Sequence, residues 1–337
     1  MTNFTLLKAK FKNASLKLND YIIFKFKYNP KGILEGYNIY GYVSRVMGQG
    51  EVVRAYVEQL IIDDQKFALV DFIDVNHDSI NDNEELKYKK YYSRKLKYKN
   101  NIFFIDLFKL KKFKRRFPSF FVNKNNIAVF WWEYESGFED RIEILNEFDE
   151  VYVFSDFIKS TLDQIENKSF KVNKIPYPFK CNWIIEQSPE DTKAKYRLSD
   201  KFCFFFNFDY TSSYYRKNPE AVLKAFSEEF AENEDVILVF KINNSSAYQK
   251  QDNLFNSLIS EFRLTNRVLI IKETLTRNSF MTLLNAMDCY ISLHRGEGLG
   301  LGILEAFSLG KPVIATNYGG NTEYMMNELA YPVNYSL

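Results

Sequence analysis

Short apolar runs alternate with longer amphipathic segments along most of this chain, and this alternation constrains the fold more than any other feature. The apolar runs have the length of buried strands, and the segments between them repeat apolar residues at helical spacing. Such alternation predicts parallel sheets with helices on both faces. We expect strands at 37–43, 66–72, 102–107, 126–131, 151–154, 201–208, 236–242, 267–271, 289–293 and 313–315. We expect helices at 51–62, 141–148, 156–165, 219–232, 248–262 and 277–287, and a last helix that ends at Gly310.

The pattern breaks at a segment that contains Pro176 and Pro178, which cannot lie inside a helix. It starts again near residue 201. Because 337 residues are long for a single core, we expect an α/β protein with two Rossmann-like domains, 1–178 and 179–337. A hydrophobic content of 46% supplies material for packed cores and excludes a disordered chain.

The cysteines and the N-terminus bear on the compartment. Cys181, Cys203 and Cys289 are far apart and form no C-x-x-C pair, which argues against a disulfide framework or a zinc site and fits a reducing cytosol. The N-terminal residues lack the apolar core of a signal peptide, and no run approaches the length needed to cross a bilayer. We therefore expect a cytoplasmic location.

The charge is unevenly distributed, although the formal net charge is only +2. Residues 87–116 contain thirteen basic residues and one acidic residue, Asp106, interleaved with aromatic and aliphatic side chains. Such a segment suits the anionic inner face of a membrane, where each cation contributes about 1 kcal/mol, or a phosphate-bearing lipid-linked acceptor. A solvated lysine-rich face beside a buried strand explains it equally well. We expect no nucleic-acid partner, because no recognition motif accompanies the patch.

Residues 291–325 combine acids, glycines and a helix pattern in an order that suits a ligand site. Glu297 and Glu305 are eight positions apart, with Gly298, Gly300 and Gly302 between them. Glycines let the backbone approach a ligand closely, and a helix N-terminus offers N–H groups to an anion. We expect Glu297 in the loop and Glu305 inside the following helix, so that both face one bound molecule.

This block resembles the E-x7-E signature of retaining GT-B glycosyltransferases of the glycosyltransferase 4 type. The glycine-rich loop, the continuation EAFSLGKPVIAT and the paired glycines Gly319 and Gly320 follow the family's order. The resemblance implies two Rossmann-like domains that face a central cleft, and transfer of a sugar from a nucleotide diphosphate with retention of configuration. The family usually continues through further strands and helices, so the second domain is expected to be short at its C-terminus.

The resemblance also implies roles for individual residues. Glu297 would hold donor-sugar hydroxyls and Glu305 the ribose hydroxyls, while the N–H groups of residues 298–300 would face the diphosphate. In the family, a lysine of an R/K-x-N-P-type segment touches that diphosphate, which assigns the role to Lys217 with Arg216 as a helper. Many relatives place an arginine nearer the strand end, where this chain has residues 209–212. A surface pair without a ligand role is the alternative. The donor-binding candidates are thus Glu305, Gly298, Leu299, Gly300, His294, Gly319 and Gly320.

Two segments of the first half are weaker candidates. Gly48 and Gly50 lie in a predicted loop between a strand and a helix, and they could meet donor phosphate or form an ordinary turn. Trp132 and Glu133 follow another strand, in a segment that resembles the W-x-E-type acceptor side of relatives. Buried tryptophan packing with a solvated glutamate is equally compatible. His77 lies in an acidic loop and has no expected role.

We therefore expect a glycosyltransferase of surface polysaccharide or glycoconjugate biosynthesis that acts on a glycan or lipid-linked acceptor. No cofactor is expected, and a metal-independent mechanism is expected because the chain lacks an Asp-x-Asp motif and a cluster with metal-ligand spacing. The alternatives are a non-catalytic GT-B subunit of a transferase complex and a nucleic-acid-binding protein that uses residues 87–116.

Overall fold

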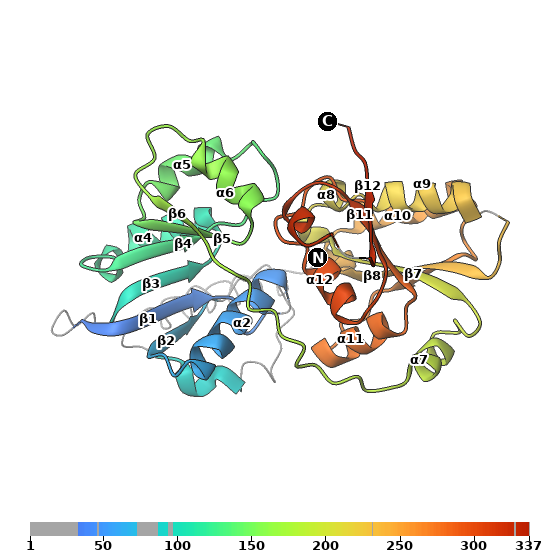
Figure 1. The fold of residues 1–337 in the computed structure, drawn as a ribbon, viewed down its shortest axis with the longest axis horizontal. Helices are drawn as coiled ribbons and strands as arrows, with labels where there is room; N and C mark the ends of the chain where they lie inside the picture. Colours follow the sequence, from blue (N-terminus) through green and yellow to red (C-terminus); the bar gives the residue numbers. More distant parts are fainter. Residues whose placement is uncertain are drawn as a thin grey trace, which may run out of the picture. The chain divides into compact units, whose positions relative to one another are not determined.

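The computed structural model describes residues 33–45, 47–72, 87–93, 97–230, 232–326 and 328–336. Two compact units divide the chain near Phe179, each with a six-stranded parallel sheet (Figure 1). Two short segments of the N-terminal half, Trp132–Gly137 and Phe154–Gln164, pack with Lys180–Leu337 in unit 2. The domain boundary expected between residues 178 and 179 stays a prediction. That expectation assigned all residues up to 178 to the first domain, so it did not include the packing of these two segments with unit 2.

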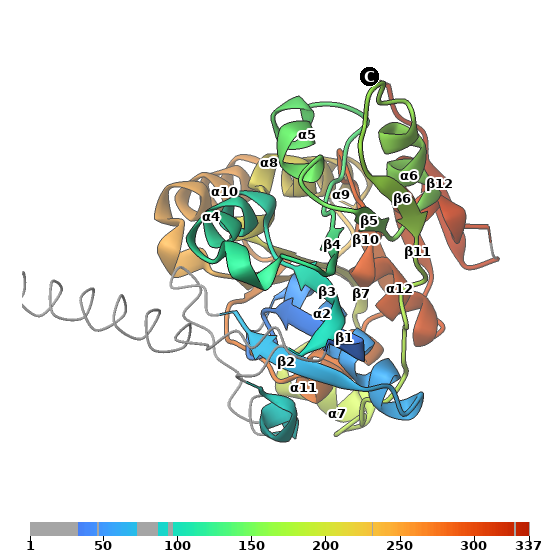
Figure 2. The ribbon, with the colours of Figure 1, turned by 90° about the vertical axis from the view of Figure 1, so that its left-hand side faces the viewer.

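The sheet of unit 1 has the strand order β2-β1-β3-β4-β5-β6. Its strands are β1 (Leu34–Gly41), β2 (Phe67–Asp71), β3 (Tyr98–Phe104), β4 (Asn125–Val129), β5 (Glu150–Val153) and β6 (Lys171–Lys174). Its helices are α2 (Gly48–Ile62), α4 (Leu107–Arg116) and α5 (Glu139–Leu145), with 3-10 turns η1 (Lys89–Tyr91) and η2 (Pro118–Phe120). Helices α4 and α5 lie on one face of the sheet and α2 on the other (Figures 1 and 2).

Buried asparagines connect the central strands of this sheet. Asn38 on β1 donates to Asn101 Oδ1 on β3 at 2.8 Å, and Asn101 donates to Asn126 Oδ1 on β4 at 2.8 Å. Asn38 and Asn101 are fully buried. Because each amide supplies a partner for the next, the ladder specifies the register of three neighbouring strands.

Three elements of unit 1 differ from the sequence expectation. Helix α2 begins at Gly48, so Gly48 and Gly50 lie in its first turn and the expected loop is wrong. Helix α4 lies in the basic segment 87–116, for which we expected a strand at 102–107 and no helix; Asp106 caps α4 by accepting from the N–H groups of Phe108 and Lys109. Strand β6 was not expected, because its lysine-rich sequence lacks an apolar run.

The sheet of unit 2 has the strand order β12-β11-β10-β7-β8-β9. Its strands are β7 (Phe202–Asp209), β8 (Val236–Asn243), β9 (Val268–Ile271), β10 (Cys289–Ser292), β11 (Val313–Thr316) and β12 (Ala330–Val333). Its helices are α6 (Asp156–Asp163), α7 (Pro189–Lys195), α8 (Tyr214–Lys217), α9 (Pro219–Phe230), α10 (Gln249–Glu261), α11 (Arg277–Asn285) and α12 (Leu301–Ser308). Three 3-10 turns complete the unit, η3 (Tyr210–Ser212), η4 (Ser245–Ala247) and η5 (Gly320–Glu323).

The strand order of unit 2 reverses between β7 and β10. From β7 the chain passes outward to β8 and β9 with α9 and α10 packed against each other, and then it crosses to β10 on the other side of β7. Loops that follow two adjacent strands at such a reversal meet at one edge of the sheet, where open α/β sheets bind ligands. The fold therefore brings residues 210–218 next to residues 293–300.

Within the described ranges, no helix combines the length and the apolar character required to cross a bilayer.

Candidate active site

Two loops at the edge where the strand order of unit 2 reverses are tied together by their backbones. After β7, the short helix α8 ends at Asn218, which has a left-handed backbone (φ 54°) and allows α9 to begin at Pro219. The Asn218 side chain donates to the carbonyl of Leu293 at 2.8 Å, and the N–H of Arg295 donates to the carbonyl of Arg216 at 2.8 Å. These bonds hold the two cations of α8 against the loop that contains Glu297.

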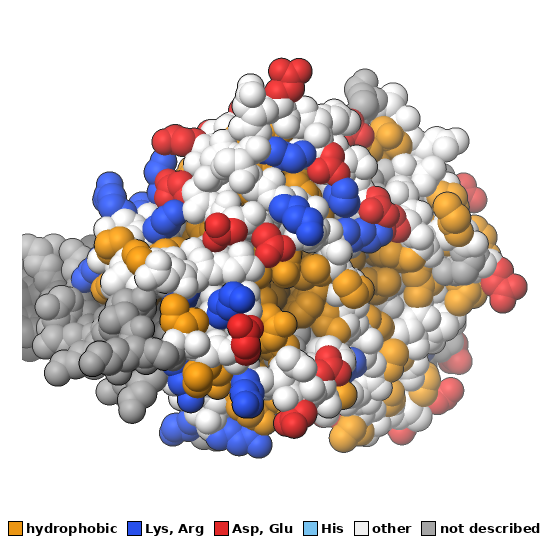
Figure 3. Space-filling model, turned by 60° about the vertical axis from the view of Figure 1, so that its left-hand side comes forward, with side chains coloured by type: hydrophobic (Ala, Val, Ile, Leu, Met, Phe, Trp, Pro, Cys, Tyr) orange, Lys and Arg blue, Asp and Glu red, His pale blue; other side chains and the backbone are white. Residues whose placement is uncertain are grey.

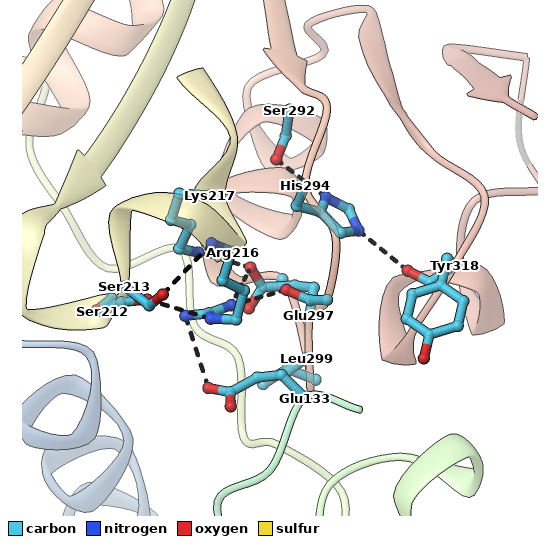
Figure 4. A network of polar contacts seen from close by, with 12 residues as sticks. Glu133, Ser212, Ser213, Arg216, Lys217, Ser292, His294, Glu297, Leu299 and Tyr318 are labelled. Atoms are coloured by element: carbon cyan, nitrogen blue, oxygen red, sulfur yellow. Dashed lines mark hydrogen bonds and ion pairs between the residues drawn. The ribbon is translucent and has the colours of Figure 1, made fainter. Parts of the chain in front are cut away.

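The Glu297 carboxylate binds both cations (Figure 4). Lys217 Nζ lies 2.6 Å from Glu297 Oε2, and Arg216 Nη1 lies 3.3 Å from the same oxygen. Burial alone would raise the pKa of Glu297, but Lys217 and Arg216 outweigh it and lower the pKa to about 2. Glu297 is therefore ionised throughout the neutral range. Burial lowers the pKa of Lys217, and Glu297 opposes that shift.

The Arg216 side chain connects three segments of unit 2. Its guanidinium donates from Nη1 to the carbonyl of Gly296 at 2.8 Å and from Nε to the carbonyl of Ser212 at 3.2 Å. Nη2 lies 3.6 Å from Glu133 Oε1 in the loop 132–137 (Figure 4). Burial alone would lower the pKa of Arg216, but Glu297 and Glu133 outweigh it and raise the pKa. The guanidinium already serves protein acceptors, whereas the Lys217 ammonium has Glu297 as its carboxylate partner.

The glycines of the site allow backbone segments to approach one another. A Cβ on Gly298 would lie 2.4 Å from the carbonyl oxygen of Trp132, so only glycine fits under the loop 132–137. Gly319 has φ 101° and lies against the backbone of Glu297, and the N–H of Gly320 donates to the carbonyl of Glu297 at 2.7 Å. The paired glycines thus support the Glu297 loop directly.

The helix that follows this loop begins without a side-chain cap. Gly300 takes a left-handed conformation (φ 82°) at the N-cap of α12, and no side chain accepts from the first turn. The phenol of Tyr324 donates to the carbonyls of Leu299 and Gly300, which fixes the loop from behind. The N–H of Ile303 donates to the carbonyl of Gly300, and the start of α12 presents the positive end of the helix dipole to an anion.

His294 is almost fully buried, and both ring nitrogens have partners. Nε2 lies 3.0 Å from the carbonyl oxygen of Tyr318, and Nδ1 lies 3.1 Å from Ser292 Oγ (Figure 4). Because a carbonyl only accepts, Nε2 carries the proton. Burial lowers the pKa of His294, so the ring is neutral and Nδ1 accepts from Ser292. A direct hydrogen bond from His294 to the donor stays a prediction, and it requires the loss of one of these contacts.

Glu305 lies inside α12, as expected, and is 5% exposed. Its carboxylate lies 2.5 Å from Arg277 Nη1, at the first residue of α11. The guanidinium of Arg277 also lies over the Trp183 ring, 5.4 Å from its centroid. Arg277 therefore orients the acid for which we predict ribose binding.

The chain is similar to known proteins in sequence and in fold. Residues 210–330 match the family described as "Glycosyl transferases group 1". The chain is 29% identical over 122 residues to a sucrose synthase from Melioribacter roseus, a match that spans 33% of this chain and only 15% of that protein. Among solved structures, it resembles HepE (Alr3699) from Anabaena, in complex with UDP and glucose, with a TM-score of 0.67, 12% identity, and coverage of 90% of this chain and 86% of that chain. It also resembles sucrose-phosphate synthase from Thermosynechococcus elongatus, with a TM-score of 0.60, 14% identity, and coverage of 87% and 84%.

These matches support a GT-B glycosyltransferase. They confirm the expected two-domain α/β fold of GT-B type. The match to the family lies within unit 2 and contains Lys217, Glu297 and Glu305.

The remaining sequence candidates lie in other parts of the chain or have structural contacts of their own. Gly50 belongs to unit 1, where a Cβ would lie 2.3 Å from the carbonyl oxygen of Arg45, so this glycine is required for packing. The donor-binding roles of Gly48 and Gly50 stay predictions. Trp132 donates from Nε1 to the carbonyl of Ser136 at 3.0 Å, which shapes the loop that also contains Glu133. His77 lies outside the described residues.

Sequence reasoning missed Arg277 and the link between Glu133 and Arg216. Arg277 begins a helix that follows strand β9. The rule that open α/β sheets bind ligands at the carboxyl ends of their strands could have found it. Lys241 lies near the end of β8 and is not a solvated lysine. It is 3% exposed, its Nζ donates to Asn243 Oδ1 at 2.6 Å, and burial lowers its pKa to about 8.

Proposed function

We propose that this chain is a retaining glycosyltransferase that moves a sugar from a nucleotide diphosphate to a glycan or lipid-linked acceptor. The observation that carries this proposal is the meeting of Lys217, Glu297 and the uncapped start of α12 at one edge of the unit 2 sheet. The HepE structures in complex with UDP and glucose and with UDP-glucose support a nucleotide-sugar donor.

The donor diphosphate replaces Glu297 as the counter-ion of Lys217. When the bond from the anomeric carbon to the diphosphate oxygen breaks, negative charge grows on the departing oxygen. Lys217 and the N–H groups at residues 298–300 stabilise that charge in a fixed geometry, which is the largest catalytic contribution in many enzymes. Glu297, ionised at neutral pH, then accepts hydrogen bonds from donor-sugar hydroxyls, and Glu305 does the same for the ribose.

The acceptor attacks from the side that the diphosphate leaves, which retains the configuration at the anomeric carbon. The departing phosphate oxygen takes the acceptor proton, because no side chain of the Glu297 network is available as a base: His294 is bonded at both ring nitrogens, and Glu297 has a pKa of about 2. Arg216 stabilises the geometry of Glu297 rather than touching the diphosphate.

We also propose a cytoplasmic enzyme of surface polysaccharide or glycoconjugate biosynthesis that contacts the anionic inner face of a membrane through residues 87–116. The described part of this segment includes α4, whose Lys112, Arg115 and Arg116 are exposed. Lys111 and Lys114 pair with Glu143 and Glu147, so part of the basic charge is compensated within the unit. On the face seen in Figure 3, basic side chains are interspersed with acidic ones.

A panel of nucleotide sugars tests the donor assignment. A donor that binds the native state raises the midpoint of thermal unfolding, and its turnover in the presence of oligosaccharides reports transfer. Stabilisation with transfer to any oligosaccharide and retention at the anomeric carbon by NMR supports the proposal. Stabilisation without turnover favours a non-catalytic subunit, and no stabilisation by any nucleotide sugar contradicts the donor assignment.

A further inference from the structure

The loop 132–137 presents its two acids to different surroundings. Glu133 pairs with Arg216 in the donor-side network, whereas Glu135 lines a separate hollow of about 410 Å³ in unit 2. Helix α6 contributes Asp156, Phe157 and Ser160 to this hollow, Gln164 follows at the end of that helix, and η5 contributes Glu323. The volume lies within the range of small-ligand sites, about 300–1,000 Å³.

The chemistry of the lining selects one class of ligand. It combines hydroxyl, amide and carboxylate groups with the half-buried ring of Phe157, the mixture that receives the hydroxyls and the C–H face of a sugar ring. Three of the described lining residues are acidic and none is basic. Phosphates, sulfates and carboxylated sugars are therefore disfavoured by like-charge repulsion, whereas a neutral sugar donates hydroxyl hydrogens to the carboxylates.

Contacts join the hollow to the Glu297 loop. The Phe157 ring packs edge-on against Tyr318 at 5.2 Å, and Tyr318 accepts from His294. The Glu323 carboxylate accepts from the N–H of Asp156 at the start of α6, and Glu323 belongs to the same turn η5 as Gly320, which donates to the carbonyl of Glu297. The residues that line the hollow therefore contact, or lie in the same turn as, the residues that support the Glu297 loop.

We propose that this hollow binds the acceptor, and that the acceptor portion held there is a neutral glycan. The inference rests on the proposed transferase function and narrows its acceptor: the charged part of any lipid-linked acceptor lies outside the hollow. Glu135 lines the hollow and Glu133 pairs with Arg216, so one loop connects the proposed acceptor site with the donor-side network.

Filling the hollow tests the proposal. Ser160→Trp inserts a large side chain from α6, and Lys159→Trp on the neighbouring, non-lining position is the matched control. Binding of maltose, cellobiose, lactose and N,N′-diacetylchitobiose is measured by saturation-transfer NMR, with 3′-sialyllactose as the anionic probe. Binding of UDP-glucose by thermal shift, and a Glu135→Gln variant with a milder change, are measured in parallel.

We expect at least one neutral disaccharide to bind, with at least about tenfold weaker binding in Ser160→Trp and no change in Lys159→Trp; this corresponds to about 1.4 kcal/mol. UDP-glucose binding is expected to be the same in all variants. The proposal is overturned if no neutral disaccharide binds the unmodified protein, if Ser160→Trp binds as well, or if the sialylated probe binds equally. If no nucleotide sugar gives a thermal shift but a neutral disaccharide still binds the unmodified protein, the proposed transferase function is contradicted and the proposed sugar site is not.

Discussion

At the scale of single residues, Lys217 and Glu297 explain each other. A buried carboxylate without a partner would take up a proton, and a buried ammonium would lose one. Their 2.6 Å contact keeps both charged, and Arg216 adds a second positive charge beside Glu297. Glu297 therefore keeps the Lys217 ammonium charged within the site, where we propose that it binds an anionic ligand.

Removing the lysine should abolish most of the transfer. Lys217→Ala is expected to lower kcat/KM at least about a hundredfold, because it removes one group that stabilises the charge of the departing diphosphate. Lys224→Ala, an exposed residue of the following helix α9, is the control and should retain activity. Steady-state kinetics with the best nucleotide sugar measures both variants, and full activity of Lys217→Ala would exclude the proposed mechanism.

The same pair makes stability depend on acid. The pKa of Glu297 is about 2 in the folded chain against an ordinary value of 4.5. Because the folded pKa is depressed, its contribution is present above pH 4.5 and is lost as the pH falls toward 2, by on the order of 3 kcal/mol at most. Urea unfolding of the wild type and Glu297→Gln between pH 6 and pH 3 measures this loss. Parallel pH profiles for the two proteins would contradict the assignment.

At the scale of elements, most strands and helices follow from periodicity, and the differences have local causes. The expected strand 201–208 and helix 219–232 appear as β7 and α9 because long apolar patterns leave little choice. The sequence pattern did not predict helix α4, because six basic residues interrupt its apolar residues. The helix is stabilised by the Asp106 cap and by burial of Leu107, Leu110 and Phe113 on one side. Sequence pattern cannot show that burial before the neighbouring strands are placed.

The asparagine ladder yields a prediction about the sheet of unit 1. Asn101→Leu would leave Asn126 Oδ1 without the Asn101 donor and Asn38 without one acceptor, at a cost of about 1–3 kcal/mol for each group left unsatisfied. Asn173→Ala on the edge strand β6 is the control and should cost less, because its side chain is only half-buried. Denaturant unfolding of both variants compares them; equal losses would show that the ladder has no special role.

At the scale of the whole molecule, the sequence singled out Glu297, Glu305 and Lys217, and the fold shows which residues they contact. Lys217 and Glu297 could be predicted because each lies within a motif of contiguous residues. The pairing of Arg277 with Glu305, and of Glu133 with Arg216, joins positions far apart in the chain and depends on strand order. Motif reading places a residue at a strand end, but it does not reveal which other loop reaches the same edge.

The proposed metal-independent mechanism is a prediction about the complete chain. We expect transfer to be unchanged by an excess of EDTA, because Lys217 and the α12 N-terminus can neutralise the diphosphate without a divalent ion. Initial rates with EDTA, with added Mg²⁺ and with added Mn²⁺ measure this. Loss of transfer in EDTA that Mg²⁺ or Mn²⁺ restores would contradict it.

The exchange of segments between the halves has a practical consequence for dissecting this protein. Trp132–Gly137 and Phe154–Gln164 belong to unit 2 by packing, although they precede its sequence. A fragment that starts at Lys180 would lack the strip of chain that covers Gly298, the acid opposite Arg216 and the helix beside Tyr318. A binding experiment on the separately expressed C-terminal half would therefore use an incomplete candidate site, so the proposed function has to be tested on the uninterrupted chain.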